Sequence, residues 1–422
     1  MPSVETVQGA VDARELGLTL VHEHVRFRDE AVANEWPSRY DEQLEYDAAL
    51  VAVNAAAERG VQTIVDPTAM FGGRDVRFME RVADETGVRI VACTGIYSYD
   101  HLPHYFANRD VDVMADHFVE DIERGIQGTE IKAAFLKCAA DAAGVTENVE
   151  KIHRAVARAS VQTGAPIMAH SMPAVGTGPR QVEIFKEEGV DMSRVQIAHC
   201  GDSEDVEYIE GLIDSGVYVG LDRYGLEMYL SMEKRNATAA ELLRRGHAER
   251  LMISQDFCAT IDWFPPEAAE IFEGQGAIRN WSMTLVFDEV APALRELGVM
   301  DDAVFQTIFT ENPRRWIRTP RRPPVGTSRS TRRSPARSSA ARRARGAAAR
   351  RRPRCASRSA GTSPARSGRV QRTRPSRSAP RCSRRPRCRR SARSAPSRGR
   401  RPPLRRSRPV AVRSRRPASS AP

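Results

Sequence analysis

The first 318 residues of this 422-residue chain are predicted to fold as a parallel (β/α)₈ barrel, followed by a basic tail without a fold. Eight short runs rich in β-branched and other apolar residues alternate with longer amphipathic stretches. Several of these stretches end in glycine just before the next run, as loops between a helix and a strand prefer. Eight such units in about 300 residues match the usual length of a closed barrel.

The predicted strands follow one another at regular intervals, and most end in a polar residue. They span residues 16–24, 61–66, 88–97, 131–138, 166–170, 195–199, 217–222 and 251–256. Amphipathic helices are predicted between most of them, at residues 41–58, 75–85, 113–125, 149–163, 180–188, 203–214 and 238–246. A final helix pair is expected at 282–296 and 301–309, and the barrel is expected to end at 311–316. An open, doubly wound sheet is the main alternative, but no G-x-G-x-x-G motif follows the first strand to support a dinucleotide-binding fold.

The C-terminal tail, residues 319–422, has a composition unlike the rest of the chain. From Arg321 onward it contains 35 Arg but no Lys, Asp or Glu, and it is otherwise mostly Pro, Ser, Ala and Gly. Such a segment cannot build an apolar core, so it is predicted to be disordered. The formal net charge of +11 comes from this tail, because the first 320 residues carry a net charge of about −24.

Two interpretations of the tail stay open. An arginine-rich arm would bind nucleic acid through its phosphates, although no aromatic residues alternate with the arginines to stack on bases. Alternatively, the tail is a frameshift product, because GC-rich codons translated out of frame give this composition and the change occurs where the predicted barrel ends.

The rest of the composition argues for a cytoplasmic protein. No run of 18 apolar residues is present, so no membrane span is expected. The segment 1–5 is not a basic region leading into an apolar run, so no signal peptide is expected. Cys93, Cys138, Cys200 and Cys258 occur singly rather than as C-x-x-C pairs, which fits reduced thiols better than disulfides or a structural zinc site.

Functional side chains of such a barrel lie at the C-terminal ends of its strands, where four of the nine histidines occur. His22 and His24 end the first strand and share one face, because side chains alternate along a strand. Asp256 ends the eighth strand, which neighbours the first in a closed barrel, so these three side chains can hold one metal ion. His170 and His199 end strands five and six and can hold a second.

Lys137 ends the apolar fourth strand, where a charged lysine would be costly to bury. A buried lysine tends to lose its proton, and the neutral amine can react with carbon dioxide to form a carbamate. Ala133, Phe135 and Lys137 share one face of the strand, whereas Lys132 lies on the other. Lys137 is therefore predicted to be an N6-carboxylysine that bridges two divalent metal ions. Zinc, cobalt, iron and manganese all suit imidazole and carboxylate ligands.

Simpler interpretations apply to other residues of the strand ends. Asp66 is expected to be a structural hydrogen-bond acceptor, and Cys138, Cys200 and Cys258 are expected to pack rather than to bind metal. Tyr97, Tyr99, Trp263 and Phe264 either line a pocket for an apolar substrate or form ordinary loop packing.

Residues 1–318 resemble the phosphotriesterase-like lactonases of the amidohydrolase superfamily. The matching stretches occur in order over the whole domain, at residues 19–24, 63–68, 94–97, 132–140, 187–191, 199–202, 220–225 and 311–313. The resemblance implies that His22, His24 and Asp256 bind the more buried metal and that His170 and His199 bind the other. Carboxylated Lys137 and a hydroxide would bridge the two metals. It also implies a TIM barrel and a homodimer.

The implied activity is quorum-quenching lactonase activity on N-acyl-homoserine lactones and related γ/δ-lactones, with side activity on organophosphate triesters such as paraoxon. The bridging hydroxide would attack the lactone carbonyl, assisted by the Tyr97 hydroxyl, and Asp256 would move the proton to the leaving alkoxide. Tyr97 marks the lactonase branch, and Arg223, Cys258 and Trp263 would shape the acyl pocket. A dedicated aryldialkylphosphatase is the alternative enzyme, and nucleic-acid binding through the tail is the alternative outside enzymes.

One departure from the family pattern lies beside a predicted ligand. The family often has Ser-His-Asp where this chain has Ser254-Gln255-Asp256. Because the replaced histidine is not a ligand, metal binding is expected to survive. Gln255 is expected to give Asp256 weaker support than the histidine would.

Overall fold

The structure is a computed structural model that describes residues 2–97, 100–265, 267–318 and 410–411. Eight parallel strands form its centre in the order β11-β10-β9-β8-β7-β6-β5-β3. They are β3 (Thr19–Leu20), β5 (Thr63–Asp66), β6 (Arg89–Gly95), β7 (Phe135–Ala139), β8 (Ile167–His170), β9 (Val195–Ala198), β10 (Tyr218–Leu221) and β11 (Leu251–Ile253). The parallel pair β4 (Glu23–His24) and β12 (Phe257–Cys258) joins the first and last of them. The predicted (β/α)₈ TIM barrel is therefore confirmed.

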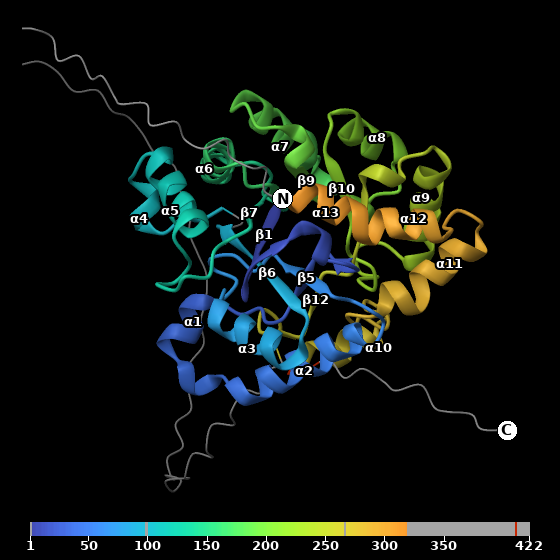
Figure 1. The fold of residues 1–422 in the computed structure, drawn as a ribbon, viewed down its shortest axis with the longest axis horizontal. Coiled ribbons are helices and arrows are strands. Elements are labelled where there is room, and N and C mark those ends of the chain that lie inside the picture. The colour runs from blue at the N-terminus through green and yellow to red at the C-terminus, as the bar shows by residue number, and fades with distance from the viewer. Residues whose placement is uncertain (1, 98–99, 266, 319–409, 412–422) are drawn as a thin grey trace, which may run out of the picture. The chain divides into compact units, whose positions relative to one another are not determined.

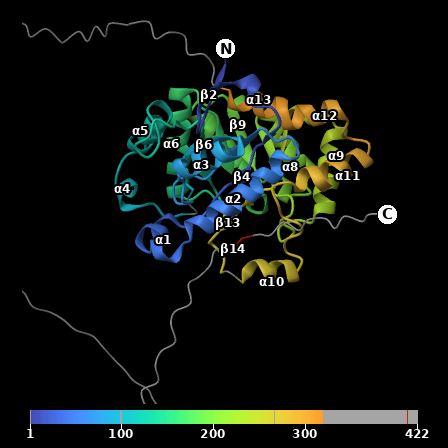
Figure 2. The same cartoon turned by 60° about the horizontal axis from the view of Figure 1, so that its bottom comes forward.

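Helices surround these strands, as Figures 1 and 2 show. Along the chain, helices and strands alternate. They are α2 (Glu42–Ala57), α3 (Val76–Thr86), α5 (Val111–Glu123), α6 (Glu147–Thr163), α7 (Thr177–Glu187), α8 (Val206–Asp214), α9 (Met232–Arg244), α11 (Ala291–Glu296), α12 (Asp302–Gln306) and α13 (Asn312–Ile317). Side chains of short polar residues cap several of them: Asp41 caps α2, Thr146 caps α6 and Ser231 caps α9. Each cap accepts a backbone N–H that has no partner within the helix, which fixes where the helix begins. No helix within these described residues is long and apolar enough to cross a membrane.

Several boundaries differ from the predicted ones. Strand β7 begins at Phe135 rather than at residue 131, because the Ala133 N–H donates to the carbonyl oxygen of Asp121 in the last turn of helix α5 (3.1 Å) instead of to a neighbouring strand. Helix α9 begins at Met232, six residues before the predicted start, because Ser231 supplies a cap. Helices α1 (Glu30–Glu35), α4 (His104–Ala107) and α10 (Ala268–Gly274) were not predicted.

Apolar side chains close the end of the barrel that lies opposite the C-terminal ends of the strands. The hairpin β1 (Ser3–Thr6) and β2 (Gly9–Asp12) places Val4 in the same buried cluster as Trp316 of α13 and Phe135 of β7. The rings of Phe135 and Trp316 lie 5.6 Å apart, edge to face. This interior packing leaves the C-terminal ends of the strands as the open end of the barrel.

Two residues of the tail are described. Strand β14 (Val410–Ala411) pairs antiparallel with β13 (Thr260–Ile261), so these two residues depart from the predicted absence of structure. The rest of the tail, to which the prediction of disorder applies, lies outside the described residues.

Gly95, at the end of β6, allows strands β6 and β7 to approach closely. Its φ is +131°, and an added Cβ would overlap the carbonyl oxygen of Lys137. Gly95→Ala is therefore expected to lower the free energy of unfolding by about 2–5 kcal/mol, through a strained backbone and a displaced neighbouring strand. Thermal and denaturant unfolding measure this loss. Gly211→Ala in helix α8, where an added Cβ meets no atom within 4 Å, should leave stability unchanged or raised. Equal effects of the two changes would contradict this explanation.

Candidate metal centre

The ten residues singled out by the sequence come together at the C-terminal ends of the strands. They line one cavity with a volume of about 150 Å³. These residues are His22, His24, Tyr97, Lys137, His170, His199, Arg223, Asp256, Cys258 and Trp263. The strand order explains the convergence, because every strand of a parallel barrel delivers its last side chains to the same end.

His22 and His199 are held by one carboxylate. Asp222, which follows β10, accepts a hydrogen bond from His22 Nδ1 (2.8 Å) through one oxygen and from His199 Nδ1 (3.0 Å) through the other. The backbone N–H of His199 also donates to Asp222 (2.7 Å). These contacts leave the Nε2 atoms of both rings directed toward the centre of the site. Such an outer hydrogen bond fixes the tautomer that a metal-binding histidine needs.

The other two histidines are anchored in the same manner. His24 Nδ1 lies 2.7 Å from the Thr68 hydroxyl, so its Nε2 faces the site. His170 is turned the other way: its Nε2 lies 3.3 Å from the Asp141 carboxylate, and its Nδ1 lies 3.0 Å from His199 Nε2. Each ring therefore presents one nitrogen to the centre and uses the other for orientation.

Burial favours the neutral form of three of these imidazoles, His22, His170 and His199, by lowering their pKa values. It lowers the pKa of His170 to about 4, and burial together with the charge of Arg223 holds the pKa of His199 well below its ordinary value. Burial, reinforced by Lys137, also lowers the pKa of His22. A neutral imidazole has the free lone pair that metal binding requires.

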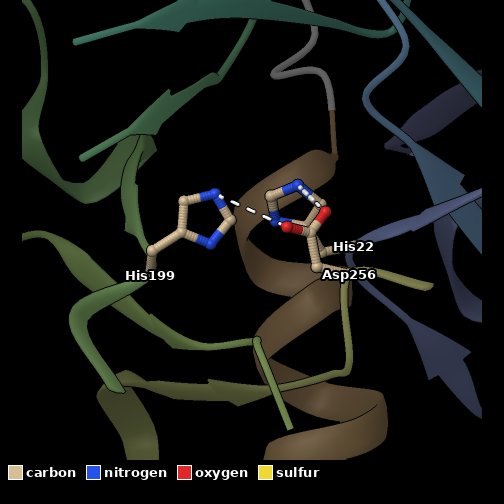
Figure 3. Close-up of side chains that lie close together, drawn as sticks. All are labelled: His22, His199 and Asp256. Atoms are coloured by element: carbon tan, nitrogen blue, oxygen red, sulfur yellow. Dashed lines mark ion pairs between the residues drawn. The ribbon is translucent and has the colours of Figure 1, made fainter. Parts of the chain in front are cut away.

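Asp256 joins the two sides of the cluster. One carboxylate oxygen lies 3.3 Å from His22 Nε2 and 3.2 Å from His24 Nε2, and the other lies 3.9 Å from His199 Nε2. Figure 3 shows the His22 and His199 rings directed at this carboxylate. Burial alone would raise the pKa of Asp256, but the neighbouring histidines and Arg223 outweigh burial and hold the pKa well below its ordinary value.

Two residues of the cluster have an unusual backbone conformation. His199 has φ +64° and Asp256 has φ +52°, a left-handed region that side-chain-bearing residues seldom occupy. The Asp256 N–H donates to the carbonyl oxygen of His22 (3.0 Å), which holds the aspartate in this conformation. Backbone strain of this kind persists where the surrounding structure enforces it, and it is frequent at functional sites.

Lys137 lies beneath the histidines and is buried, whereas Lys132 is half-buried. The Nζ atom of Lys137 lies 3.3 Å from His22 Nε2 and 3.5 Å from the sulfur of Met168. Burial lowers the pKa of this amine. The neutral amine predicted from the sequence is therefore consistent with its surroundings.

The donor set fits metal ions. Ligand atoms of His22, His199 and Asp256 lie within 4.8 Å of one another, which identifies a possible metal site among the described residues. This group joins one histidine from each of the two predicted ligand sets, so the structure brings the two sets together as a single cluster. Neutral nitrogens and carboxylate oxygens are suitable ligands for Zn²⁺ and similar divalent ions.

Aromatic and aliphatic side chains form the walls above the cluster. The Trp263 ring lies 4.5 Å from Phe27 and 5.5 Å from Tyr97, and the Tyr97 hydroxyl lies 3.2 Å from His170 Nδ1. Phe264 also lines the cavity, as the sequence predicts. Tyr99, the remaining predicted aromatic, lies outside the described residues.

The cysteines and Asp66 have surroundings that suit structural residues. Asp66 accepts backbone N–H groups of Val25 and Thr68, both at 2.9 Å. Cys138 and Cys200 are fully buried in the apolar core, and Cys258 is buried at the cavity wall. The four described cysteines are free thiols.

Gln255 is expected to support Asp256 less than a histidine would, and its side-chain amide bonds to other residues. Its amide donates to the Glu23 carboxylate (2.8 Å) and to the Met283 carbonyl oxygen (3.1 Å) rather than to Asp256. The carboxylate of Asp256 is instead supported by Arg223, whose Nε donates to it at 3.1 Å. Gln255, the residue that departs from the family pattern, therefore contacts Glu23 and Met283 rather than the side chains of the metal cluster.

Sequence reasoning missed the orienting carboxylates Asp222 and Asp141. The sequence places Asp222 at the end of the seventh predicted strand. Its orienting role depends on His22 and His199, which come from two other strands. Asp222→Asn is expected to weaken the metal affinity of the apo protein by about 10–100-fold, because an amide cannot accept hydrogen bonds from both rings at two oxygens. Metal titration of the apo protein measures this. Unchanged affinity would exclude an orienting role, and Asp214→Asn on the surface of α8 is the control.

Comparison with known proteins agrees with this site. Residues 2–317 match the phosphotriesterase family. The chain is 46% identical over 308 residues to an aryldialkylphosphatase of Saccharolobus solfataricus, and the match covers 73% of this chain and 97% of that relative. It is 41% identical over 323 residues to a phosphotriesterase homology protein of Mycobacterium tuberculosis, with coverage of 75% and 97%.

A solved structure shows the same likeness. The phosphotriesterase from Mycobacterium tuberculosis superposes with a TM-score of 0.71 at 40% identity, over 75% of this chain and 98% of that chain. The matched region coincides with the barrel and contains all ten residues of the cavity that the sequence singled out. The chain therefore belongs to the phosphotriesterase family.

Proposed function

We propose that the protein is a metal-dependent lactonase that hydrolyses N-acyl-homoserine lactones and related γ/δ-lactones, with side activity on phosphotriesters. One observation carries the proposal: a cluster of buried histidines opens directly onto an apolar cavity, with the Tyr97 hydroxyl at the boundary between the two. Such a cavity suits a substrate with a polar reacting group and an apolar tail.

We assign the ligands of two divalent ions to the cluster, because the family depends on a binuclear metal centre. His22, His24 and Asp256 would hold one ion, and His170 and His199 the other, with carboxylated Lys137 between them. When bound, such ions supply an activated water at neutral pH and polarise a carbonyl oxygen. Zinc is our first assignment, with cobalt, iron and manganese as alternatives.

The chain's own residues would perform the remaining steps. The Asp256 carboxylate, ionised and held by Arg223, accepts the proton of the attacking water and returns it to the leaving alkoxide. The Tyr97 hydroxyl donates a hydrogen bond to the carbonyl oxygen, where negative charge develops in the transition state. Phe27, Trp263 and Cys258 exclude water from the tail of the substrate.

An aryldialkylphosphatase is the second candidate, and the name of the Saccharolobus solfataricus relative favours it. The same residues could act on a phosphotriester, because its tetrahedral phosphorus resembles the transition state of lactone hydrolysis. Values of kcat/KM for homoserine lactones and for paraoxon distinguish the two candidates. A lactone kcat/KM below the paraoxon value would overturn the lactonase proposal.

Tyr97→Phe separates the two reactions further. Loss of one hydrogen-bond donor to the developing oxyanion is expected to lower kcat for lactones by about 10²-fold. Turnover of paraoxon should fall less if the phenol serves the lactone carbonyl in particular. Steady-state kinetics on both substrates, with metal content measured in parallel, gives the result. Equal losses on both substrates would mean that Tyr97 acts only by positioning His170.

Three further assignments belong to the same proposal. A homodimer follows from the resemblance and is tested by light scattering. A cytoplasmic location fits the free, buried thiols and is tested by cell fractionation. Nucleic-acid binding remains an alternative only for the tail, which lies outside the described residues apart from Val410 and Ala411, and a DNA-binding assay on the full chain tests it.

A further inference from the structure

Arg235 is a buried arginine at the start of helix α9 that the mechanism does not use. Only 2% of its surface is exposed. Its guanidinium donates to the carbonyl oxygens of Leu230 (2.9 Å), Gly201 (2.7 Å) and Leu226 (3.3 Å), and to the carboxylate of Asp202 (2.7 Å). Because one buried side chain donates to three backbone carbonyl oxygens, Arg235 fixes the positions of these backbone segments rather than serving as a solvated charge.

Two of these carbonyls, those of Leu226 and Leu230, lie at the two ends of a segment that forms part of the cavity wall. The segment 226–230, which we call the wall segment, begins at Leu226 and ends at Leu230, and Arg235 holds it at both ends. Between them, Met228 and Tyr229 line the cavity together with Leu226. Elsewhere the wall segment is attached by the Met228 N–H, which donates to the Ala277 carbonyl oxygen (2.8 Å).

Arg235 is also connected to the reacting end of the site. The second oxygen of Asp202 accepts a hydrogen bond from Arg223 (3.0 Å), and Arg223 donates in turn to Asp256 (3.1 Å). The Arg223 guanidinium lies 4.5 Å from the centre of the Tyr229 ring. Charges alternate along Asp256, Arg223, Asp202 and Arg235, so each buried charge has an opposite neighbour.

We propose that Arg235 is a positioning residue that sets the length of acyl chain the cavity accepts. It holds both ends of the wall segment, so that Met228 and Tyr229 keep fixed positions in the cavity, which Trp263 and Phe264 also line. A short acyl chain stays near the histidine cluster, whereas a long chain must pass the wall segment. This inference rests on the proposed lactonase function for its choice of substrate, but not for its geometry.

Arg235→Lys is the most informative substitution, because it keeps the charge beside Asp202 but loses the planar fork that reaches several carbonyls. Each lost hydrogen bond weakens the attachment modestly, so KM for dodecanoyl-homoserine lactone should rise about tenfold relative to KM for the butanoyl compound. The kcat values for the two substrates should keep their ratio. Arg244→Lys, on the exposed side of the same helix, is the matched control and should change neither ratio.

Binding is measured separately from turnover. Calorimetric titration of both lactones into the metal-stripped full-length protein should show the same loss of long-chain preference in Arg235→Lys. If that preference changes while wild-type protein hydrolyses no lactone, the inference about Arg235 stands and the proposed lactonase function fails. If wild-type protein binds neither lactone, the inference fails.

A purely structural role for Arg235 predicts a different result. Equal losses for short and long lactones, or a lower unfolding temperature with an unchanged ratio of the KM values, would overturn the inference. If Arg235→Lys does not fold, Arg235→Gln, which removes the charge, is measured in the same two assays against the same criteria.

Discussion

Lys137→Ala is expected to empty the metal centre and to abolish lactone hydrolysis, with a loss of at least about 10³-fold in kcat/KM. The physical reason lies in the position of the amine, which is buried beneath the cluster 3.3 Å from His22 Nε2. Alanine removes the only side chain proposed to join both metal ions, and it leaves four histidines and one carboxylate to hold two dications. Metal content per chain and steady-state turnover measure the effect.

Chemical rescue makes this prediction specific. Short carboxylic acids added to Lys137→Ala should bind in the vacated space and partly restore metal content and turnover, because they replace the carboxylate of the proposed carbamate. Lys132→Ala, at a half-buried position earlier in the same segment, should keep both at the wild-type level. Full metal content in Lys137→Ala without any added acid would exclude a bridging role for the lysine.

Asp256→Asn is expected to cause the second large loss, of about 10²–10⁴-fold in kcat. The amide keeps the shape of the side chain but cannot take a proton from the attacking water. It also presents an N–H group where Arg223 now donates to a carboxylate oxygen. Both effects act on the chemical step, so kcat should fall more than KM rises.

The pH profile of turnover gives an independent check on Asp256. The wild-type carboxylate has a pKa held well below its ordinary value, so it stays ionised as the pH falls and should not limit turnover in mildly acid solution. Asp214→Asn, on the exposed end of α8, should leave kcat unchanged. A kcat in Asp256→Asn within a factor of about two of wild type would rule out the proposed proton transfer.

The architecture and the cavity residues could be predicted because both depend on simple periodicities. Alternation along a strand placed His22 and His24 on one face. Because parallel strands of a barrel all end on the same side, residues separated by more than 200 positions in the sequence could be predicted to lie together. The burial of Lys137 and the lowered pKa values of His22, His170 and His199 follow from that placement.

Features that depend on neighbours from other strands could not be predicted in this way. Asp222 orients His22 and His199 only because β10 lies beside β9 and its carboxylate reaches across to the first strand. The expectation for Gln255 concerned only Asp256, its neighbour in sequence, and gave no indication that its amide bonds to Glu23. Helix α5 ends at Glu123, two residues before the predicted end, and β7 starts late. Both follow from a backbone hydrogen bond between Ala133 and Asp121, which no local pattern reveals.

Metal analysis combined with turnover of matched substrates tests the central claim most directly. The full-length protein is stripped with a chelator, reloaded with zinc, and assayed at each stage with a homoserine lactone and with paraoxon. We expect about two divalent ions per chain, loss of both activities on stripping, recovery on reloading, and a higher kcat/KM for the lactone. Undiminished lactone turnover by the stripped protein, or turnover of paraoxon alone by the reloaded protein, would contradict it.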